Sequence, residues 1–384
     1  MKFEFATATR IVFGVGALAQ VGPAAAKMGS HALVVTGRHH ERAAPLLAQL
    51  DAQGIAHTLY AIPAEPTIQL VRTGVDLARD AHCDLVISLG GGSAIDGGKA
   101  IAALCTNPGE PLDYLEVIGG GKALTQAPLP FIAIPTTAGT GAEVTRNAVL
   151  AAPEQQVKVS LRSPLMLPDL ALVDPALTYA MPPALTAATG LDALTQLIEP
   201  FVSPLANPLT DALCREGIQR AARALRRAYH HGDDTAAREE MALASLLGGL
   251  ALANAKLGAV HGFAGPLGGI YSAPHGALCG RLLPLVTAVN LRALHARAPE
   301  SPALTRYQEV AQLLTGKATA TAEDGVAWLN ELAAELALPG LAHYGLQAEQ
   351  LGAVIAPSQR SSSMAGNPIV LTAAELHEIL VQAL

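Results

Sequence analysis

The sequence predicts a chain of two domains: an α/β domain with a parallel, doubly wound sheet over residues 1–180, and an all-helical domain over residues 181–384. Before residue 180, short apolar runs alternate with helical patterns, which is typical of parallel strands joined by right-handed crossovers. After Pro182-Pro183, β-branched runs become scarce and long Ala/Leu patterns with a helical period follow. A length of 384 residues is also enough for two hydrophobic cores.

In the first domain, the apolar runs predict strands at His31–Val35, Thr58–Ile62, Leu85–Leu89 and Pro130–Ile134. Helical patterns follow the first three runs at Glu41–Gly54, Ile68–Ala81 and Ser93–Leu104. The alternating residues Met1–Phe5 resemble a further strand, so we expect an edge strand within residues 1–13. Ligands of such sheets bind at the carboxyl ends of the strands.

In the second domain, helices are predicted at Ala184–Phe201, Pro208–Tyr229 and Asp234–Ala255. The apolar stretch Met241–Ala255 is short for a membrane span, and the segment after it is broken by Gly and Pro. We therefore expect both segments to be buried helix and loop, and we expect no membrane partner.

Composition and charge exclude several classes of function. The net charge of −7 and a pI near 5.9 argue against a nucleic-acid or anionic-membrane surface. The four cysteines are scattered without a CxxC pair, and the N-terminus lacks a signal-peptide core, so we expect a reduced, cytoplasmic setting.

A glycine-rich turn follows the predicted strand Leu85–Leu89. Gly90, Gly91 and Gly92 precede Ser93, which we expect to cap the next helix. Unpaired N–H groups at such a helix end bind phosphate, and glycine lets the phosphate approach the backbone. The turn matches neither the Walker A nor the Rossmann fingerprint, so a tight strand–helix turn that packs closely is the alternative.

A second turn, Pro135–Glu143, contains glycines and threonines and again follows a strand. Its threonines can contact a ribose or simply cap a helix. Two such turns after neighbouring strands favour a dinucleotide ligand.

The helical half contains candidate metal ligands. Asp192 and Gln196 are four residues apart on one helical face, and His261 and His275 lie beside glycine-rich turns. An Asp with two His residues can hold a divalent metal with an open position. The alternative is that each histidine is an ordinary core residue.

The order of these motifs resembles the iron-containing (group III) alcohol dehydrogenase family, whose fold is a Rossmann-like domain followed by a helical domain. The resemblance extends over nearly the whole chain, through Gly90–Asp96, Pro135–Glu143, Asp174-Pro175, Thr189–Leu194, Val260-His261, Pro266–Gly269, Pro274–Gly276 and Asn367-Pro368.

This resemblance implies roles for individual residues. The pyrophosphate of the coenzyme would be held by Gly91, Gly92 and Ser93. Asp96 would lie near the nicotinamide, and together with His275 it is a candidate catalytic residue. The coenzyme would also be lined by Thr136, Thr137 and Thr140, with Lys158 at its ribose. Asp192, His261 and His275 match three of the four metal ligands, and the metal, iron or zinc, would act as a Lewis acid.

Two positions depart from the family. Gln196 stands where the fourth ligand is usually His, and Gly265 where a second His is common. A neutral amide oxygen is a poorer ligand for iron or zinc than imidazole. Loss of the metal is a feature of the related maleylacetate reductases, although that branch tends to change the Asp position, which is intact here. Without a His at position 265, proton transfer to solvent would need His275, a hydroxyl or water.

The choice between NAD and NADP depends on the residues that follow the predicted strand His31–Val35. An acidic residue there would bind the ribose hydroxyls of NAD, but the position holds Gly37, followed by Arg38. Arg38 can pair with the 2′-phosphate of NADP, or it can be exposed without contacts, so the sequence favours NADP without excluding NAD.

The sequence thus predicts an NAD(P)-dependent oxidoreductase that interconverts a small alcohol and an aldehyde or ketone with the help of a metal. The alternatives are a metal-free enoate reductase similar to maleylacetate reductase, a lyase similar to dehydroquinate synthase, and a coenzyme-binding protein without catalysis. Few basic residues near the histidines argue against the lyase. The family also implies a homodimer.

Overall fold

The computed structural model describes residues 2–155, 157–271 and 273–384. They form two compact units. One contains Thr7–Thr137 and Gly141–Tyr179. The other contains Ala180–Leu384 together with Ala138–Thr140 and the first residues of the chain, up to Ala6. These last two short segments differ from the predicted division, because they group with the helical unit although they precede residue 180.

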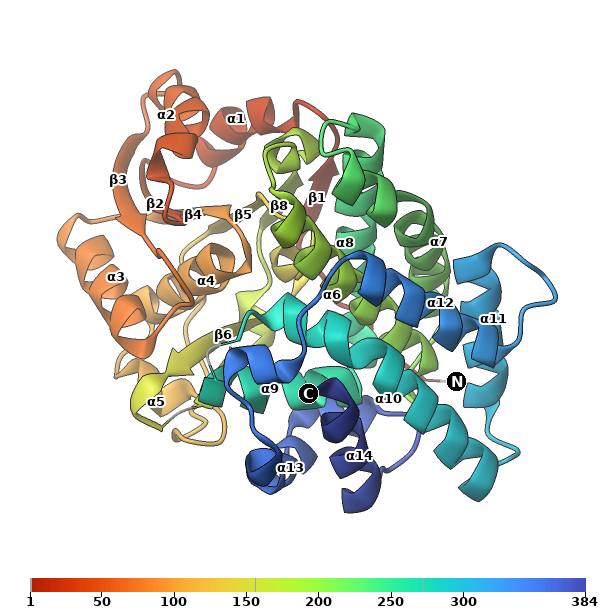
Figure 1. The fold of residues 1–384 in the computed structure, drawn as a ribbon. Helices are drawn as coiled ribbons and strands as arrows, with labels where there is room; N and C mark the ends of the chain where they lie inside the picture. Colours follow the sequence, from red (N-terminus) through yellow and green to blue (C-terminus); the bar gives the residue numbers. More distant parts are fainter. Residues whose placement is uncertain (1, 156, 272) are drawn as a thin grey trace. The chain divides into compact units, whose positions relative to one another are not determined.

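The α/β unit is built on a six-stranded sheet in which every neighbouring pair of strands is parallel (Figure 1). In spatial order the strands are β1 (Arg10–Phe13), β8 (Leu170–Val173), β5 (Phe131–Pro135), β4 (Leu85–Gly90), β2 (His31–Thr36) and β3 (Ala56–Ala61). The predicted parallel sheet is confirmed. The expected strand at Met1–Phe5 is wrong: Met1 lies outside the described residues, Lys2–Phe5 form no strand, and the edge strand is β1.

Helices cover both faces of this sheet because its strands are apolar on both sides. Leu33 and Val35 of β2 belong to the core that includes α3 (Ile68–Asp80) and α4 (Gly92–Thr106). Val34 packs in the opposite core with α1 (Val21–Ala25) and α2 (Ala44–Asp51). The predicted helix at Glu41–Gly54 is shorter than expected, since a 3₁₀ turn at His40–Ala43 precedes α2.

Smaller elements complete this unit. A two-stranded antiparallel sheet, which the sequence did not predict, joins β6 (Asn147–Ala152) to β7 (Val157–Arg162), and α5 covers Pro111–Tyr114. Further 3₁₀ segments lie at Ala17–Gln20, Ala142–Val144, Pro153–Gln155, Pro164–Met166 and Pro175–Thr178.

The second unit is helical throughout its regular elements. It contains α6 (Pro183–Val202), α7 (Pro208–His230), α8 (Thr235–Ala255), α9 (Ala259–Tyr271), α10 (His275–Arg297), α11 (Pro302–Thr315), α12 (Ala322–Glu335), α13 (Leu351–Gln359) and α14 (Ala373–Ala383). Short 3₁₀ segments lie at Leu341–Tyr344, Ala348–Gln350 and Ser362–Gly366. After Ala255, residues 256–258 belong to no regular element and α9 follows with Pro266 inside it, so this segment contains both the expected loop and helix.

Among the described residues, α10 is long and apolar enough to span a membrane by length and composition, and α8 with α9 passes the same test only if this bent pair is taken as one span. Most of the apolar window of α10 is buried, and this helix packs against α6, α9, α12 and α14. This is the environment of a core helix in a folded domain.

Candidate active site

The two predicted glycine turns lie side by side at the carboxyl edge of the sheet. Gly90 at the end of β4 pairs with Pro135 at the end of β5, and the Thr136 N–H donates to the Gly90 carbonyl at 2.9 Å. A Cβ placed on Gly91 would lie 3.4 Å from the Thr137 side chain. The first N–H groups of α4 therefore open beside Thr137, where the unpaired donors of a helix N-terminus favour an anion.

The capping of α4 differs from the prediction. The N-cap is Gly91, in an extended conformation and without a side-chain hydrogen bond, so Ser93 lies inside the first turn and does not cap the helix. The later glycines of the motif serve packing: a Cβ on Gly98 would lie 1.9 Å from Ser88 Oγ, and one on Gly97 would lie 1.9 Å from Ile62 Cδ1. Close packing thus explains Gly97 and Gly98, whereas Gly91 has room for a side chain.

Other predicted coenzyme residues have varied surroundings. Arg38 is exposed, just beyond β2 and the half-buried Gly37. The Lys158 ammonium lies 2.6 Å from the Glu65 carboxylate, so it already has an acidic partner. Asp96 on α4 accepts a hydrogen bond from the Val149 N–H at 3.0 Å. The remaining predicted residue, Thr140, belongs to the helical unit.

A buried lysine anchors the chain after the second glycine turn to α4. Lys99 Nζ donates to the carbonyls of Ala142, Thr145 and Asn147 at 2.7–2.9 Å. Burial lowers the pKa of Lys99 to about 8, and burial also raises the pKa of Glu143 to about 7. Burial disfavours the charged form of each group, so both pKa values are shifted toward neutrality.

In the helical unit, α6 carries three buried polar side chains on one face. Asp192, Gln196 and Glu199 are spaced i, i+4 and i+7, and each is at most 5% exposed. A polar stripe on the buried face of an otherwise apolar helix is costly unless each group has a partner. The stripe therefore indicates a site.

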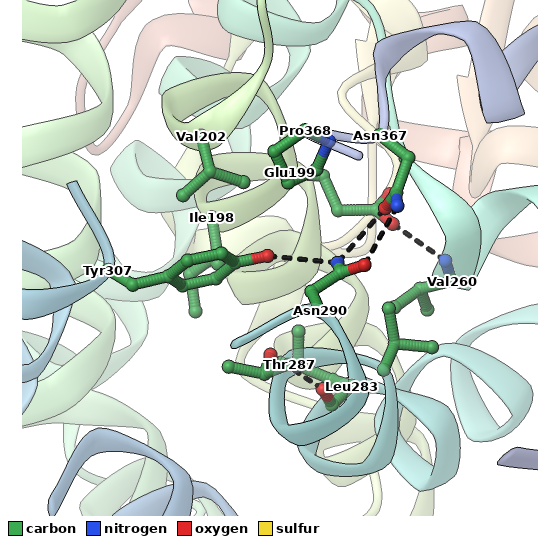
Figure 2. Close-up of a pocket in the computed structure, with 12 residues that line it drawn as sticks. Ile198, Glu199, Val202, Val260, Leu283, Thr287, Asn290, Tyr307, Asn367 and Pro368 are labelled. Atoms are coloured by element: carbon green, nitrogen blue, oxygen red, sulfur yellow. Dashed lines mark hydrogen bonds between the residues drawn. The ribbon is translucent and has the colours of Figure 1, made fainter. Parts of the chain in front are cut away.

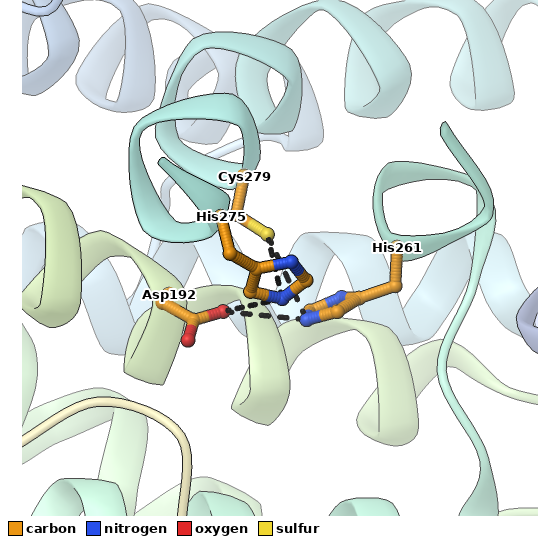
Figure 3. A group of neighbouring side chains, drawn as sticks. All are labelled: Asp192, His261, His275 and Cys279. Carbon is orange, nitrogen blue, oxygen red and sulfur yellow. Dashed lines mark hydrogen bonds and ion pairs between the residues drawn. The ribbon is translucent and has the colours of Figure 1, made fainter. Parts of the chain in front are cut away.

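Four side chains from α6, α9 and α10 converge on one point (Figure 3). His261 Nε2 lies 3.3 Å from Asp192 Oδ1, and His275 Nε2 lies 3.7 Å from the same oxygen. Cys279 Sγ lies 3.7 Å from both Nε2 atoms. These four ligand atoms all lie within 4.8 Å of one another. The structure thus brings together the predicted residues Asp192, His261 and His275, and adds Cys279.

The orientation of the His261 ring is fixed by a partner of its other nitrogen, Nδ1. Its Nδ1 lies 2.7 Å from Glu199 Oε2, and the other carboxylate oxygen accepts the Val260 N–H at 2.7 Å. With Nδ1–H donated to the carboxylate, the Nε2 lone pair points toward Asp192 and Cys279. Glu199 is a site residue that the sequence analysis missed, although its spacing from Asp192 on one helical face was visible.

A polar network supports Glu199 and the start of α9 (Figure 2). Asn367 Oδ1 accepts from the Ala259 N–H at 3.2 Å and from Asn290 Nδ2 at 3.0 Å. Asn290 also donates to the Tyr307 hydroxyl at 3.0 Å, inside a small pocket that Glu199 lines. The network holds the first turn of α9, and therefore His261, in a defined position.

The cluster fits a divalent cation. Burial acts to raise the pKa of Asp192, but His275 and His261 outweigh it, so this pKa lies below its ordinary value. Burial acts to lower the pKa of His261, but Cys279, Asp192 and Glu199 raise it well above its ordinary value. Positive charge is thus favoured here. Asp192 Oδ1 and Gln196 Oε1 are buried and have no hydrogen-bond partner of good geometry in the described part of the chain, so both retain free lone pairs.

The structure also shows how solvent reaches the cluster and how much space surrounds Gly265. The His275 side chain is 38% exposed, whereas those of Asp192 and His261 are 2% and 6% exposed, so solvent reaches the cluster from the side of His275. Gly265 lies one turn after His261, and a Cβ on it would meet nothing within 4 Å. The space of a side chain is therefore open at this position.

Comparison with known proteins gives consistent matches along the chain. The family model described as "Iron-containing alcohol dehydrogenase" matches residues 8–175, and "Fe-containing alcohol dehydrogenase family, C-terminal" matches residues 186–384. The chain is 38% identical over 339 residues to alcohol dehydrogenase 4 of Schizosaccharomyces pombe, covering 88% of this chain and 78% of that protein. It is 37% identical over 349 residues to 1,3-propanediol dehydrogenase of Klebsiella pneumoniae, covering 88% and 87%.

Solved structures agree with these matches. A 1,3-propanediol oxidoreductase structure superposes with a TM-score of 0.92 at 34% identity, covering the full length of both chains. A sulfoacetaldehyde reductase from Bifidobacterium kashiwanohense, in complex with NAD+, superposes with a TM-score of 0.87 at 30% identity, covering 100% of this chain and 99% of that one.

Proposed function

The chain belongs to the iron-containing alcohol dehydrogenase family and is an oxidoreductase that interconverts an alcohol and an aldehyde, and we propose here the parts that its residues play in that reaction. The family uses NAD(H) and a divalent metal. The observation that carries the proposal is the convergence of Asp192, His261 and His275 on one point, with a buried carboxylate oxygen left free.

These three residues would hold the metal, and Gln196 would offer its free amide oxygen from one turn after Asp192. When bound, the cation acts as a Lewis acid on the alcohol or carbonyl oxygen and lowers the pKa of the alcohol. Glu199 fixes the tautomer of His261, so that Nε2 keeps its lone pair for the metal. His275, partly exposed, lies on the side where substrate enters and a proton leaves to solvent.

The coenzyme would bind at the carboxyl edge of the sheet. The N–H groups of Gly91, Gly92 and Ser93 at the start of α4 would receive the pyrophosphate, since donors and helix dipole both favour an anion there. The second glycine turn would line the nucleotide through Thr136, Thr137 and Thr140. Asp96 would lie toward the nicotinamide, and Lys158 would reach the ribose by exchanging its contact with Glu65.

The proposed preference for NADP over NAD rests on Arg38. This residue is exposed and has no acidic residue within ion-pair distance in the described part of the chain, and it follows the strand whose end normally meets the adenine ribose. A guanidinium there would pair with a 2′-phosphate, which favours NADP. We further propose a small alcohol as the substrate, a homodimer as the assembly and the cytoplasm as the location.

The experiment is to assay the purified protein with small alcohols and aldehydes, using NAD(H) and NADP(H), before and after removal of metal with EDTA. We expect turnover that EDTA abolishes and that zinc or iron restores. Asp192→Ala should lose turnover while it still binds the coenzyme in a calorimetric titration. Undiminished turnover of the metal-free protein would refute the role of the metal, and the absence of any heat with either coenzyme would refute the dinucleotide site.

A further inference from the structure

We propose that the Cys279 thiolate is a ligand of the metal in this chain, in addition to Asp192, His261 and His275, and that it supplies the strong fourth donor that Gln196 does not. The inference rests on the metal site of the proposed function. Cys279 is buried, and its sulfur faces both histidines from one turn along α10 (Figure 3).

Four of the six distances among these atoms lie in the range expected for ligands around a zinc ion. Zinc binds sulfur at about 2.3 Å and nitrogen or oxygen at about 2.0–2.2 Å, which gives edges between neighbouring ligands of roughly 3.3–3.7 Å. The corresponding distances in the structure are 3.3 Å between His261 and Asp192, 3.7 Å between His275 and Asp192, and 3.7 Å from Cys279 to each histidine. Because all four ligand atoms lie within 4.8 Å of one another, an ion placed between them would be near each of them.

The backbone explains why Cys279 reaches this point. His275 is the first residue of α10, and Cys279 is four residues later on the same helical face. The side chains at these two positions therefore project in the same direction, toward α6 and α9. Another buried cysteine of the same unit, Cys214 on α7, is not among the residues of the cluster and provides a matched control.

The thiolate changes the charge and the metal preference of the site. Binding converts Cys279–SH and a divalent cation into a thiolate–metal bond and releases one proton to solvent. A cation held by one carboxylate and one thiolate has its two charges balanced, whereas Gln196 contributes no charge. Soft thiolate ligands favour zinc and cobalt over iron, so Cys279 should move the preference of this chain away from iron.

The experiment follows the metal–sulfur bond directly, with Cys279→Ser, Cys214→Ala and Gln196→Ala variants beside the unaltered protein. Each metal-free protein is loaded with Co²⁺ and its near-ultraviolet spectrum is recorded for a sulfur-to-cobalt charge-transfer band. The zinc-loaded unaltered protein is measured by X-ray absorption at the zinc edge. Circular dichroism establishes that each variant is folded.

We expect the charge-transfer band in the unaltered, Cys214→Ala and Gln196→Ala proteins, and its loss in Cys279→Ser. The zinc spectrum should contain one sulfur neighbour at about 2.3 Å. Zinc affinity should fall by at least about 10–100-fold in Cys279→Ser. Mutation of residues that only orient a metal ligand already lowers metal affinity by this amount. The preference for zinc over iron should also narrow in this variant. Affinity for zinc would then decrease more than affinity for iron.

Two outcomes would overturn the inference. One is a zinc shell of nitrogen and oxygen neighbours only, a measurement that needs no variant. The other is a charge-transfer band that survives in Cys279→Ser. In either case, EDTA-sensitive dehydrogenase activity would leave the proposed function standing, whereas failure of that activity would remove the function whatever the ligands are.

Discussion

Replacement of Glu199 by Gln tests how the protein orients His261. The carboxylate receives two donors at once, the His261 Nδ1–H and the Val260 N–H, each at 2.7 Å. A glutamine of the same shape has one oxygen, so its NH₂ group must face one of these two donors. The variant loses one charge-assisted hydrogen bond, worth about 1.5–3 kcal/mol, and no longer holds Nε2 toward the metal.

The expected result is metal affinity lowered about 10–100-fold, the range found for residues that orient metal ligands. This range corresponds to about 1.4–2.8 kcal/mol, which agrees with the loss of one such hydrogen bond. The assay is zinc competition against a chelator at fixed pH, with Glu309→Gln as a control, since Glu309 is paired with Arg215 at the surface of α11 and α7. Zinc affinity equal to that of the unaltered protein would refute the orienting role of Glu199.

Three further predictions concern other parts of the chain. Burial raises the pKa of Glu143 to about 7, so the folded state binds more protons than the unfolded state between its ordinary pKa and 7. Stability should therefore fall as pH rises through this window, by up to about 3 kcal/mol, and urea unfolding of Glu143→Gln should lack this slope; an unchanged slope would contradict the assignment. Gly265→Ala in α9 should raise the stability of the protein by about 0.5–1 kcal/mol because the space is open, whereas Gly276→Ala in α10, whose Cβ would lie 2.3 Å from the Ala188 carbonyl oxygen, should lower that stability by about 1–3 kcal/mol. Thermal unfolding checks both glycine variants, and equal shifts would refute the packing argument. Arg38→Ala should raise the KM for NADP about tenfold or more and leave that for NAD nearly unchanged, whereas equal effects on both coenzymes would exclude a 2′-phosphate contact.

The four strands that were predicted each have a run of five largely apolar residues, whether the strand is buried throughout, as Leu85–Gly90 is, or partly exposed, as Ala56–Ala61 is. Leu85–Leu89 is an unbroken apolar run except for Ser88, and it forms the middle of the sheet. The strand Leu170–Val173 was missed because four residues are too few for a recognisable sequence pattern. It forms a strand through its pairing with β1 and β5 in the sheet. The alternating apolar and polar residues at the start of the chain wrongly predicted a strand. Phe3 is exposed there, and the Ala6 N–H and carbonyl pair with the Asn254 side chain.

The site was predictable in part. Spacing placed Asp192 and Gln196 on one face, and the family resemblance selected His261 and His275, but no pattern states that residues from three helices meet. Cys279 was missed because the cysteines were examined for pairs with each other, whereas its partner is the histidine one turn earlier. The His-x-x-x-Cys spacing was the available signal.

The role of Ser93 shows a further limit. A serine after glycines is a good N-cap in isolation, but α4 starts at Gly92 and its N-cap is Gly91, two residues before Ser93. The cap thus comes directly after Gly90, the residue of β4 that pairs with Pro135 of β5.

The central claim is that one divalent metal, held by the helical unit, is required for hydride transfer between an alcohol and the coenzyme. Its most direct test is titration of metal-free protein with zinc, with alcohol-dependent reduction of the coenzyme followed by absorbance. We expect activity to rise in proportion to added metal and to level off at one ion per chain, with no response in Asp192→Ala. Full turnover before any metal is added, or activity of Asp192→Ala equal to that of the unaltered protein, would contradict the claim.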